Sequence, residues 1–303
     1  MAKDRKPTAR ARYLGAAMQQ AMARKGTNAY QVARVLKWDE VKIYKAVYGT
    51  RPLSPLDVIY FHTRCGTPIQ KIKDLVSLAQ QQHSTRWLIT DADPLSASDV
   101  LRHYQATAGH VISFSYAVLP PELRVSGYAE ALADAVTARL RLISTRPGAC
   151  AGASLDICGS TGRLYFIDEA AIRRPVGGPD LMHEQLCVLL HVAAHPHITI
   201  RLLPTDTAWH PDDLSAFEVF HLRNGMMVHI PAGGAHSFLD DESSVSRHLR
   251  HAADLDRYAR STEDSIALIA DQLARLDRHL KEINPGTCSV PTATDCLRVA
   301  DGV

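Results

Sequence analysis

Residues 10–83 place the strongest constraint on the fold, because they form a series of short helical patterns bounded by residues that start or stop helices. Apolar residues at three- and four-residue spacing over 14–22 predict a first helix that ends at Gly26. Asn28, with Gln31 three residues later, has the spacing of a capping box and predicts the start of a second helix. We therefore expect a small helical bundle at this end of the chain.

Three further helices are expected in the same segment. Asp39 is expected to cap a third helix that stops at Gly49, and Ser54 to cap a fourth whose first residue is Pro55. A fifth helix is expected over 68–82. The second and third helices, each about nine residues long and joined by a turn of about three to four residues, have the dimensions of a helix-turn-helix.

The charges of the chain are divided unevenly between its two parts. Residues 1–80 contain 15 Lys and Arg against 5 Asp and Glu, whereas the remainder contains 19 against 27. The net charges are therefore +10 and −8, within a total of +2. Because excess positive charge replaces counterions on a polyanion, the basic end is a candidate for contact with nucleic acid. The alternative interpretation is a basic segment that only aids solubility.

Composition places the 303-residue chain among ordinary globular proteins, with 46% hydrophobic and 22% charged residues. No apolar run reaches the roughly 18 residues that a membrane helix needs, and the N-terminus lacks the pattern of a secretory signal. The six cysteines form no C-x-x-C pair, which favours a reducing compartment. We expect a cytoplasmic protein with no membrane partner.

The run N-A-Y-Q-V-A-R-V-L-K-W-D-E-V-K-I-Y-K-A-V-Y-G-T-R-P-L-S-P-L-D-V resembles the Xre-type (phage-repressor-like) helix-turn-helix of actinobacterial transcriptional regulators. In that family Ala33 and Leu36 would pack the second helix on the third, and the third helix would lie in the major groove of DNA. Together with the charge, the resemblance implies two overlapping sets of contacts. Those to bases involve Glu40, Val41, Tyr44 and Lys45, and those to phosphates involve Arg10, Arg12, Lys42, Lys45 and Arg51.

The third helix departs from the family pattern at several positions. Val41 and Tyr44 stand where small polar residues are usual, and Val47 stands where a Glu is usual. Asp39 and Glu40 also place two carboxylates at the helix end that approaches phosphates, although Asp39 is explained as a cap and Glu40 could accept a hydrogen bond from cytosine. A degenerate motif kept for packing or dimerisation is therefore an alternative.

The remainder of the chain is expected to be an α+β domain, so that the whole protein is mainly α with a small β-sheet. We place the boundaries at 1–83, 84–283 and a disordered tail over 284–303, with a flexible Gly-rich loop at 147–161. One helix is expected to begin near Ser96 or Ser98. Four more are expected to cover about 127–144, 180–193, 243–258 and 262–283, the last capped by Thr262. The expected strands are 164–167, 197–203, 217–222 and 226–230, the last two joined by a tight turn at 223–225.

Three stretches of this second part resemble the domain of unknown function that follows the helix-turn-helix in many actinobacterial regulators. They are L-P-P-E-L-R-V-S-G-Y-A-E-A-L, Y-F-I-D-E-A-A-I-R-R-P-V-G-G-P-D-L-M-H-E-Q-L and I-T-I-R-L-L-P-T-D-T-A-W-H-P. With the first resemblance, the similarity covers roughly residues 10–280. It implies a regulator, often encoded near a small partner protein, whose second domain receives an input.

The motif E-A-A-I-R-R-P-V-G-G-P allows two interpretations. Arg173 and Arg174 could clamp an anion or a carboxylate, with Glu169 nearby. Alternatively, Glu169 and one arginine pin the turn to the next helix. In both interpretations Gly177 and Gly178 permit backbone conformations that other residues avoid.

Ten of the fifteen histidines fall within 183–251. His191 and His195 lie four residues apart on an expected helix, with His197 just beyond, so these three are the candidates for a metal site. The H-E-x-x-H pattern of a metalloprotease is missing. A second group on or near the expected hairpin could bind a ligand or sense protons, namely His210, His221, His229 and His236.

The sequence favours a regulator that binds double-stranded DNA, forms a homodimer and senses a small-molecule effector or a small partner protein. The alternative is an enzyme or a metal- or cofactor-binding protein with a relic helix-turn-helix and a His-rich site. No P-loop, nucleophile elbow or dinucleotide fingerprint is present. We therefore expect no catalytic residue and no cofactor.

Overall fold

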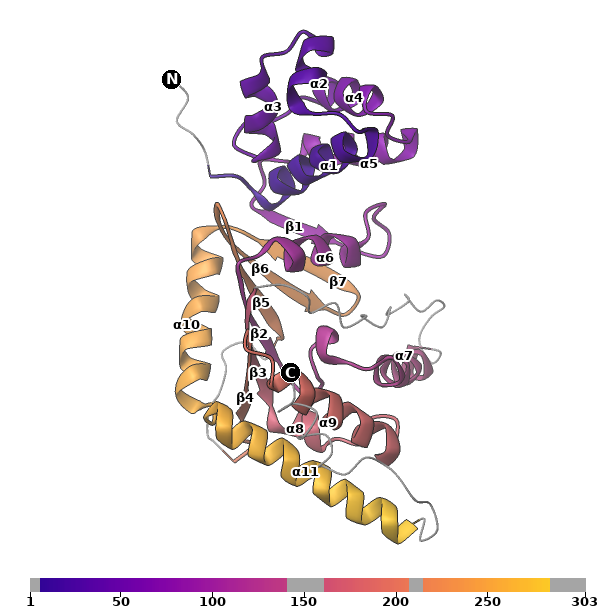
Figure 1. Cartoon of the computed structure of the whole chain (residues 1–303), viewed down its shortest axis with the longest axis vertical. Coiled ribbons are helices and arrows are strands. Elements are labelled where there is room, and N and C mark those ends of the chain that lie inside the picture. Colours follow the sequence, from indigo (N-terminus) through magenta and orange to yellow (C-terminus); the bar gives the residue numbers. More distant parts are fainter. Residues whose placement is uncertain (1–5, 141–160, 207–214, 284–303) are drawn as a thin grey trace. The chain divides into compact units, whose positions relative to one another are not determined.

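The computed structural model describes residues 6–140, 161–206 and 215–283 (Figure 1). Within these ranges it contains eleven α-helices and a mixed sheet with the strand order β1-β7-β6-β5-β2-β3-β4. The expectation of a mainly α protein with a sheet is confirmed. The predicted flexible loop at 147–161, apart from residue 161, and the predicted tail at 284–303 lie outside the described residues.

The chain divides into two compact units, and each takes its residues from two separate segments. Unit 1 combines Met1–Ala108 with Val219–Arg247, and unit 2 combines Gly109–Glu218 with His248–Val303. This division differs from the predicted boundary near residue 83. The reason is that strands from the second half of the sequence pair with a strand that directly follows the helices, a long-range pairing that local patterns do not encode.

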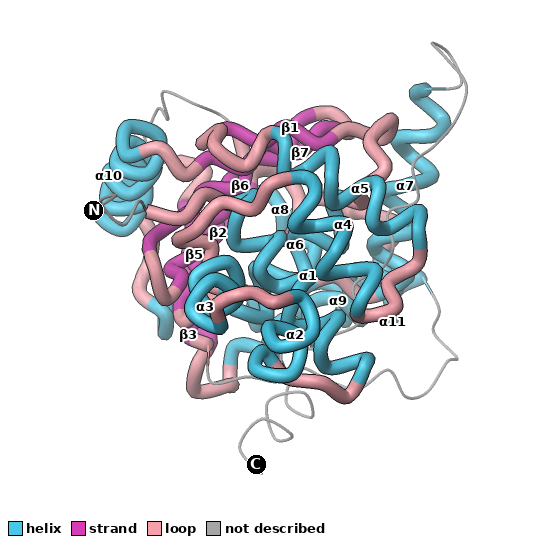
Figure 2. Tube along the Cα trace, turned by 90° about the horizontal axis from the view of Figure 1, so that it is seen from above, coloured by secondary structure: helices cyan, strands magenta, loops and turns pink. Residues whose placement is uncertain are grey.

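Five helices open unit 1 and form one bundle in both views of the backbone (Figures 1 and 2). They are α1 (Ala9–Lys25), α2 (Ala29–Leu36), α3 (Glu40–Val47), α4 (Pro55–Arg64) and α5 (Ile69–Gln80). Gly26 ends α1 in the left-handed conformation, and Asn28 and Ser54 form capping boxes with Gln31 and Asp57. The expected positions of the five helices are therefore confirmed.

The interior of the bundle is apolar and tightly packed. Leu14, Met18, Ile43 and Phe61 are almost fully buried. Gly15 lies where α1 crosses the end of α3, and a Cβ there would come within 2.0 Å of the carbonyl oxygen of Val47. This contact requires glycine because any side chain would force the two helices apart.

The rest of unit 1 is a short antiparallel sheet with one helix. It consists of β1 (Arg86–Ile89), α6 (Ala97–Thr107), β6 (Gly225–Ala232) and β7 (Ala235–Leu239), together with most of β5 (Phe217–Leu222). Strand β7 pairs with β1 on one side and with β6 on the other. Of these strands, β1 and β7 were not predicted. Each has only four or five residues, and β7 directly follows the Gly233-Gly234 turn, so neither gives a strong periodic signal.

Unit 2 is built on three parallel strands, β2 (His110–Ser115), β3 (Gly162–Asp168) and β4 (Ile198–Leu203). Its other elements are η1 (Pro121–Leu123), α7 (Ser126–Leu140), α8 (Glu169–Arg173), α9 (Pro179–Ala193), α11 (Thr262–Ile283) and the greater part of α10 (Glu242–Tyr258). Side chains of α9 and α11 bury Tyr165, Ile167 and Ile200 in one core. The cap of α11 is Ser261, whose hydroxyl accepts from Asp264 N at 3.0 Å, and not Thr262 as predicted.

Candidate functional site

Helix α3 presents one open face. Ile43 and Ala46 point into the bundle, whereas Val41 is 52% and Tyr44 is 49% exposed. Lys45 is exposed as well. Asp39 fixes the start of the helix, because its carboxylate accepts a hydrogen bond from Val41 N at 2.9 Å. The predicted base-contacting residues therefore lie on the solvent side of a short, capped helix.

Glu40 and Tyr44 interact on this open face. A hydrogen bond between the Tyr44 hydroxyl and the Glu40 carboxylate raises the pKa of Tyr44, and the nearby negative charge adds to the effect. The contact spans one helical turn, the spacing at which side chains of a helix meet. Part of the Glu40 charge is therefore already engaged by a neighbouring donor.

Lys42 does not point away from the protein as a phosphate contact would. Its Nζ atom lies 2.5 Å from Asp57 Oδ1 on α4 and 3.7 Å from the ring centroid of Trp38. Burial raises the pKa of Asp57, but hydrogen bonds from Lys42 and Ser54 outweigh this effect and lower it overall. The structure thus gives Lys42 a bracing role between α3 and α4, in place of the predicted contact with DNA.

Arg10 also differs from its predicted role. The residue is only 6% exposed, and its guanidinium donates to the carbonyl of Arg86 at 2.7 Å and to Gln81 Oε1 at 3.2 Å. The guanidinium carbon lies 5.5 Å from the ring centroid of Trp87. This arginine ties α1 to α5 and β1, so it is not available to a phosphate.

Arg12 is engaged within unit 1 in a similar way. Its side chain is 12% exposed, donates to the carbonyl of Asn224 at 3.0 Å and lies 3.9 Å from Asp240. Asp240 also accepts from the backbone N of Ala9, and burial raises the pKa of Asp240 to about 6 despite these partners. We therefore remove Arg12 from the DNA-contacting set and assign it, with Asp240, to anchoring the first turn of α1.

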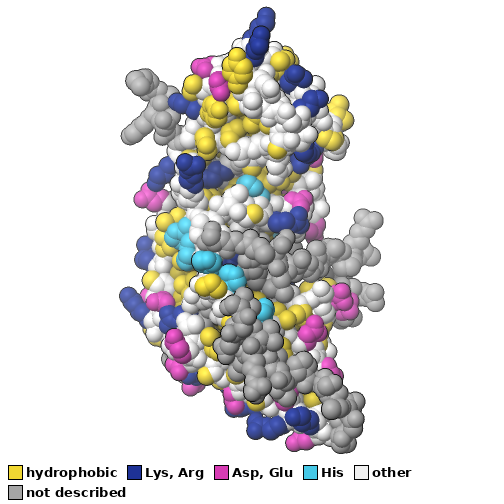
Figure 3. All heavy atoms as spheres, viewed as in Figure 1, with side chains coloured by type: hydrophobic (Ala, Val, Ile, Leu, Met, Phe, Trp, Pro, Cys, Tyr) yellow, Lys and Arg dark blue, Asp and Glu magenta, His cyan; other side chains and the backbone are white. Residues whose placement is uncertain are grey.

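Other exposed cations of the bundle were missed by the sequence analysis. Lys25, Arg34 and Arg64 line a pocket of about 620 Å³ together with Tyr30 and Val35. In Figure 3, basic and hydrophobic side chains lie close together on the part of the surface formed by the five helices. Tyr30, Arg34 and Val35 are exposed on α2, but Lys25 and Arg64 are the last residues of α1 and α4, so no local pattern brings the three cations together. Arg51, which was predicted, lies in the exposed turn after α3.

The motif E-A-A-I-R-R-P-V-G-G-P follows β3, and the carboxylates at its start bond to neighbouring residues of the protein. Asp168 caps α8, accepting from Ala170 N at 2.7 Å, and buried Glu169 accepts from Arg173 Nε at 2.7 Å. The guanidinium of Arg260 lies 3.8 Å from the other Glu169 oxygen. Arg174 is exposed, and Gly177 and Gly178 have positive φ as expected. This geometry favours the interpretation in which Glu169 pins the turn over the one in which Arg173 and Arg174 form a clamp.

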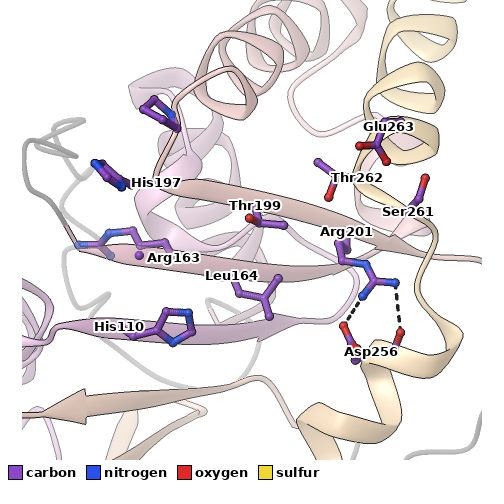
Figure 4. A pocket seen from close by; sticks show the side chains of 12 residues that line it. His110, Arg163, Leu164, His197, Thr199, Arg201, Asp256, Ser261, Thr262 and Glu263 are labelled. Atoms are coloured by element: carbon purple, nitrogen blue, oxygen red, sulfur yellow. Dashed lines mark hydrogen bonds and ion pairs between the residues drawn. The ribbon is translucent and has the colours of Figure 1, made fainter.

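A pocket of about 670 Å³ lies against β2, β3 and β4 in unit 2 (Figure 4). Figure 4 shows Arg201 reaching from β4 to Asp256 near the end of α10. The same guanidinium donates to the carbonyls of Asp256 at 3.1 Å and Ala259 at 2.8 Å. The remaining polar lining comes from His110, Arg163, His197, Thr199, Ser261, Thr262 and Glu263. Burial lowers the pKa of His110, which favours its neutral form. This lining can donate and accept hydrogen bonds to a small polar molecule.

The three histidines proposed for a metal do not converge on one point. The rings of His195 and His197 lie 5.7 Å apart, and the backbone N of His197 donates to His195 Nδ1 at 3.3 Å. His191 is exposed on α9. In the part of the chain that the structure describes, no group of three or more His, Cys, Asp or Glu is arranged to hold a metal ion.

The hairpin brings together two of its histidines. His229 on β6 and His236 on β7 are stacked, with His229 Nε2 2.9 Å from His236 Nδ1. Burial lowers the pKa of His236, and the adjacent imidazole lowers it further. His221 is half-buried on β5, and His210 lies outside the described residues. The ring of His229 is also stacked on that of Phe238, so this imidazole is part of the packing of the sheet.

A buried carboxyl pair in unit 2 escaped the sequence analysis. Glu122 in η1 hydrogen-bonds to Glu218, with Arg163 and the Tyr165 side chain nearby. Burial first, and the charge of Glu218 second, raise the pKa of Glu122 to about 8. The two carboxyls therefore share a proton at neutral pH. They are separated by almost one hundred residues in the sequence, so no local pattern could have revealed them.

The comparison with known families covers most of the second part of the chain. Residues 99–271 match the model of a domain of unknown function, DUF5753, over more than half of the chain. The chain therefore belongs to the DUF5753 family. The match starts after the five helices, and no curated protein matches the chain. Among the described residues, no helix has the length and apolar character needed to cross a membrane.

Proposed function

We propose that this protein is a transcriptional regulator that binds double-stranded DNA through α3 and receives an input through its DUF5753 region. The observation that carries the proposal is the open face of α3. A short helix, capped at its first residue and packed on α2 and α1, presents Val41, Tyr44 and Lys45 outward. This is the arrangement by which a helix-turn-helix reads the major groove.

The proposed contact set is smaller than the one expected from sequence. Lys45 and Arg51 are the cations for phosphates, and Glu40, Val41 and Tyr44 are the groups for bases, with Lys45 able to act in both ways. Arg10, Arg12 and Lys42 are engaged by other groups of unit 1. Because each phosphate contact releases about one counterion, the proposal predicts a modest dependence of affinity on salt.

The experiment is a fluorescence titration of the full chain with fragmented genomic DNA at low and moderate salt. Lys45→Ala and Arg51→Ala are compared with Lys73→Ala, which removes the same type of charge from an exposed position on α5. We expect the first two variants to weaken binding and the third to leave it unchanged. A full chain that binds no fragment at low salt would end the proposal.

The DUF5753 region supplies the input in this proposal. Its pocket against β2, β3 and β4 is of a size suited to a small effector, and its surface is available to a small partner protein. We further propose a cytoplasmic homodimer, because helix-turn-helix regulators read paired half-sites through two copies. Light scattering of the full chain tests the dimer, and a monomeric mass at micromolar concentration would contradict it.

A further inference from the structure

A cysteine, a histidine and an aspartate lie in a row between α9 and α11. The Sγ atom of Cys187 is 3.9 Å from Nδ1 of His183, and Nε2 of His183 is 2.7 Å from Oδ1 of Asp277. His183 and Cys187 are one helical turn apart on α9, so both project from the same side of that helix. Asp277 reaches them from the neighbouring helix.

The environment fixes the imidazole in one orientation. The side chain of His183 is 3% exposed and that of Asp277 is 13% exposed. The carboxylate accepts the proton of Nε2, which leaves the lone pair of Nδ1 directed at the sulfur. A base oriented by a third group and placed next to a thiol is the arrangement that activates a cysteine.

Cys65 provides a contrast within the same chain. It is buried at the end of α4, and burial raises the pKa of its thiol. Cys187, in contrast, is half-buried and has an imidazole beside it. Of these two described cysteines, only Cys187 is placed next to a base that a carboxylate orients.

We propose that Cys187 is a nucleophilic thiol that reacts with organic hydroperoxides, with His183 and Asp277 as its positioning residues. His183 Nδ1 takes the thiol proton, and Asp277 stabilises the imidazolium that forms. The thiolate attacks the terminal peroxide oxygen, so an S–O bond forms and the O–O bond breaks. The leaving alkoxide takes the proton, the sulfur is oxidised to a sulfenic acid, and the peroxide is reduced to an alcohol.

This site goes beyond the proposed DNA-binding function and does not depend on it. It lies in the region that matches DUF5753 except for Asp277, which follows the matched residues. Its chemistry is therefore measured on the thiol itself.

The first test measures the alkylation rate of each cysteine in the folded full chain with iodoacetamide between pH 5 and 9, by peptide mass spectrometry. We expect the rate profile of Cys187 to have a midpoint at least about one unit below the value of 8.5 of a free thiol. At pH 6.5 Cys187 should react at least about tenfold faster than Cys65. A Cys187 midpoint at or above that of a free thiol would overturn the proposal.

Two variants distinguish activation of the Cys187 thiol by His183 from simple exposure of the thiol to solvent. Asp277→Asn keeps the shape of the side chain and removes its charge, so the Cys187 midpoint should rise by about one unit. Glu184→Gln removes the same charge from an exposed position next to His183 and should leave the profile unchanged. Equal shifts in the two variants would show a general charge effect and contradict the assignment.

The product gives a second readout in the unmodified protein, independent of how the variants fold. Treatment with an equivalent of cumene hydroperoxide in the presence of dimedone should label Cys187 and leave Cys65 unlabelled. Equal labelling of both, or no label on Cys187, would overturn the peroxide assignment.

Discussion

Two sets of cations in the five-helix bundle carry the same charge and use it in opposite ways: one set is engaged within the protein and the other is exposed. At the start of α1, Arg10 and Arg12 donate to carbonyl groups and lie against Trp87 and Asp240. After the open face of α3, Arg51 is exposed in a turn. The comparison teaches that a net charge of +10 does not say how many cations are available to a polyanion. Some of the charge holds the bundle to the rest of unit 1.

The largest expected effect tests the buried set of cations. Arg12→Ala leaves Asp240 without its nearest cation, and we expect it to lower the free energy of unfolding by about 3 kcal/mol. Urea denaturation measures the change. Arg24→Ala, an exposed arginine on the same helix, should change stability by less than about 0.5 kcal/mol. Equal losses in the two variants would remove the distinction between buried and exposed cations.

The exposed set is tested by Lys45→Ala. We expect this variant to weaken binding to duplex DNA by about 1–3 kcal/mol, with no loss of stability, because Lys45 lies on the exposed face of α3. Fluorescence titration and urea denaturation on the same sample measure both quantities. A stability loss with unchanged affinity would place Lys45 with the buried arginines.

Measuring the free energy of unfolding at several pH values distinguishes the contribution of the buried carboxyl in unit 1 from that of the one in unit 2. The folded pKa values of Asp240 and Glu122, about 6 and about 8, lie above those of the unfolded chain. The folded state therefore holds more protons, and stability falls as pH rises, through about 6 for Asp240 and about 8 for Glu122. Between pH 6 and 8 we expect a slope of at most about 1.4 kcal/mol per unit, mainly from Glu122.

The variant Glu122→Gln tests that assignment. Its amide can still hydrogen-bond to Glu218 but cannot release a proton, so the slope of stability between pH 6 and 8 should become flatter. Glu218, Arg163 and Tyr165 face the same carboxyl and remain in place. Urea midpoints at pH 6, 7 and 8 provide the measurement, and an unchanged slope would exclude Glu122 as its source.

The smallest effect concerns Lys42, whose partly buried ammonium group meets Asp57 and Trp38 instead of pointing into solvent. Lys42→Met keeps the apolar stem and removes the charge that meets Asp57 and Trp38, and we expect a stability loss of about 1 kcal/mol. The salt dependence of DNA binding should not change. A reduced salt slope would return Lys42 to the phosphate contacts.

Local signals account for what the sequence predicted well. The capping boxes at Asn28 and Ser54 involve residues three positions apart, so they define helix ends without reference to the fold. The strands β3, β4, β5 and β6 contain enough apolar residues to be recognised. Strand β1 has four residues, and its partner β7 lies almost 150 residues later, so neither could be found from its own pattern.

The candidate site was predicted only in part, for the same physical reason. The open positions of α3 follow from helix geometry once the third helix is located. The side chains of Arg12 and Lys42 are held by Asp240 and Asp57, which lie elsewhere in the sequence. The row from Cys187 to Asp277 also needs two helices to pack together. Residue types alone did not indicate these pairings.

The anchoring of the first turn of α1 has a practical consequence for dissecting this protein. The backbone N of Ala9 donates a hydrogen bond to the carboxylate of Asp240. The carbonyl of Ala9 accepts a hydrogen bond from the hydroxyl of Tyr104 at 2.6 Å. A fragment that stops near residue 83 would keep Arg10 and Arg12 but lose Arg86, Tyr104, Asn224 and Asp240. Newly uncovered guanidinium groups in such a truncated protein would bind any polyanion, so the sequence selectivity of α3 should be measured on the intact polypeptide.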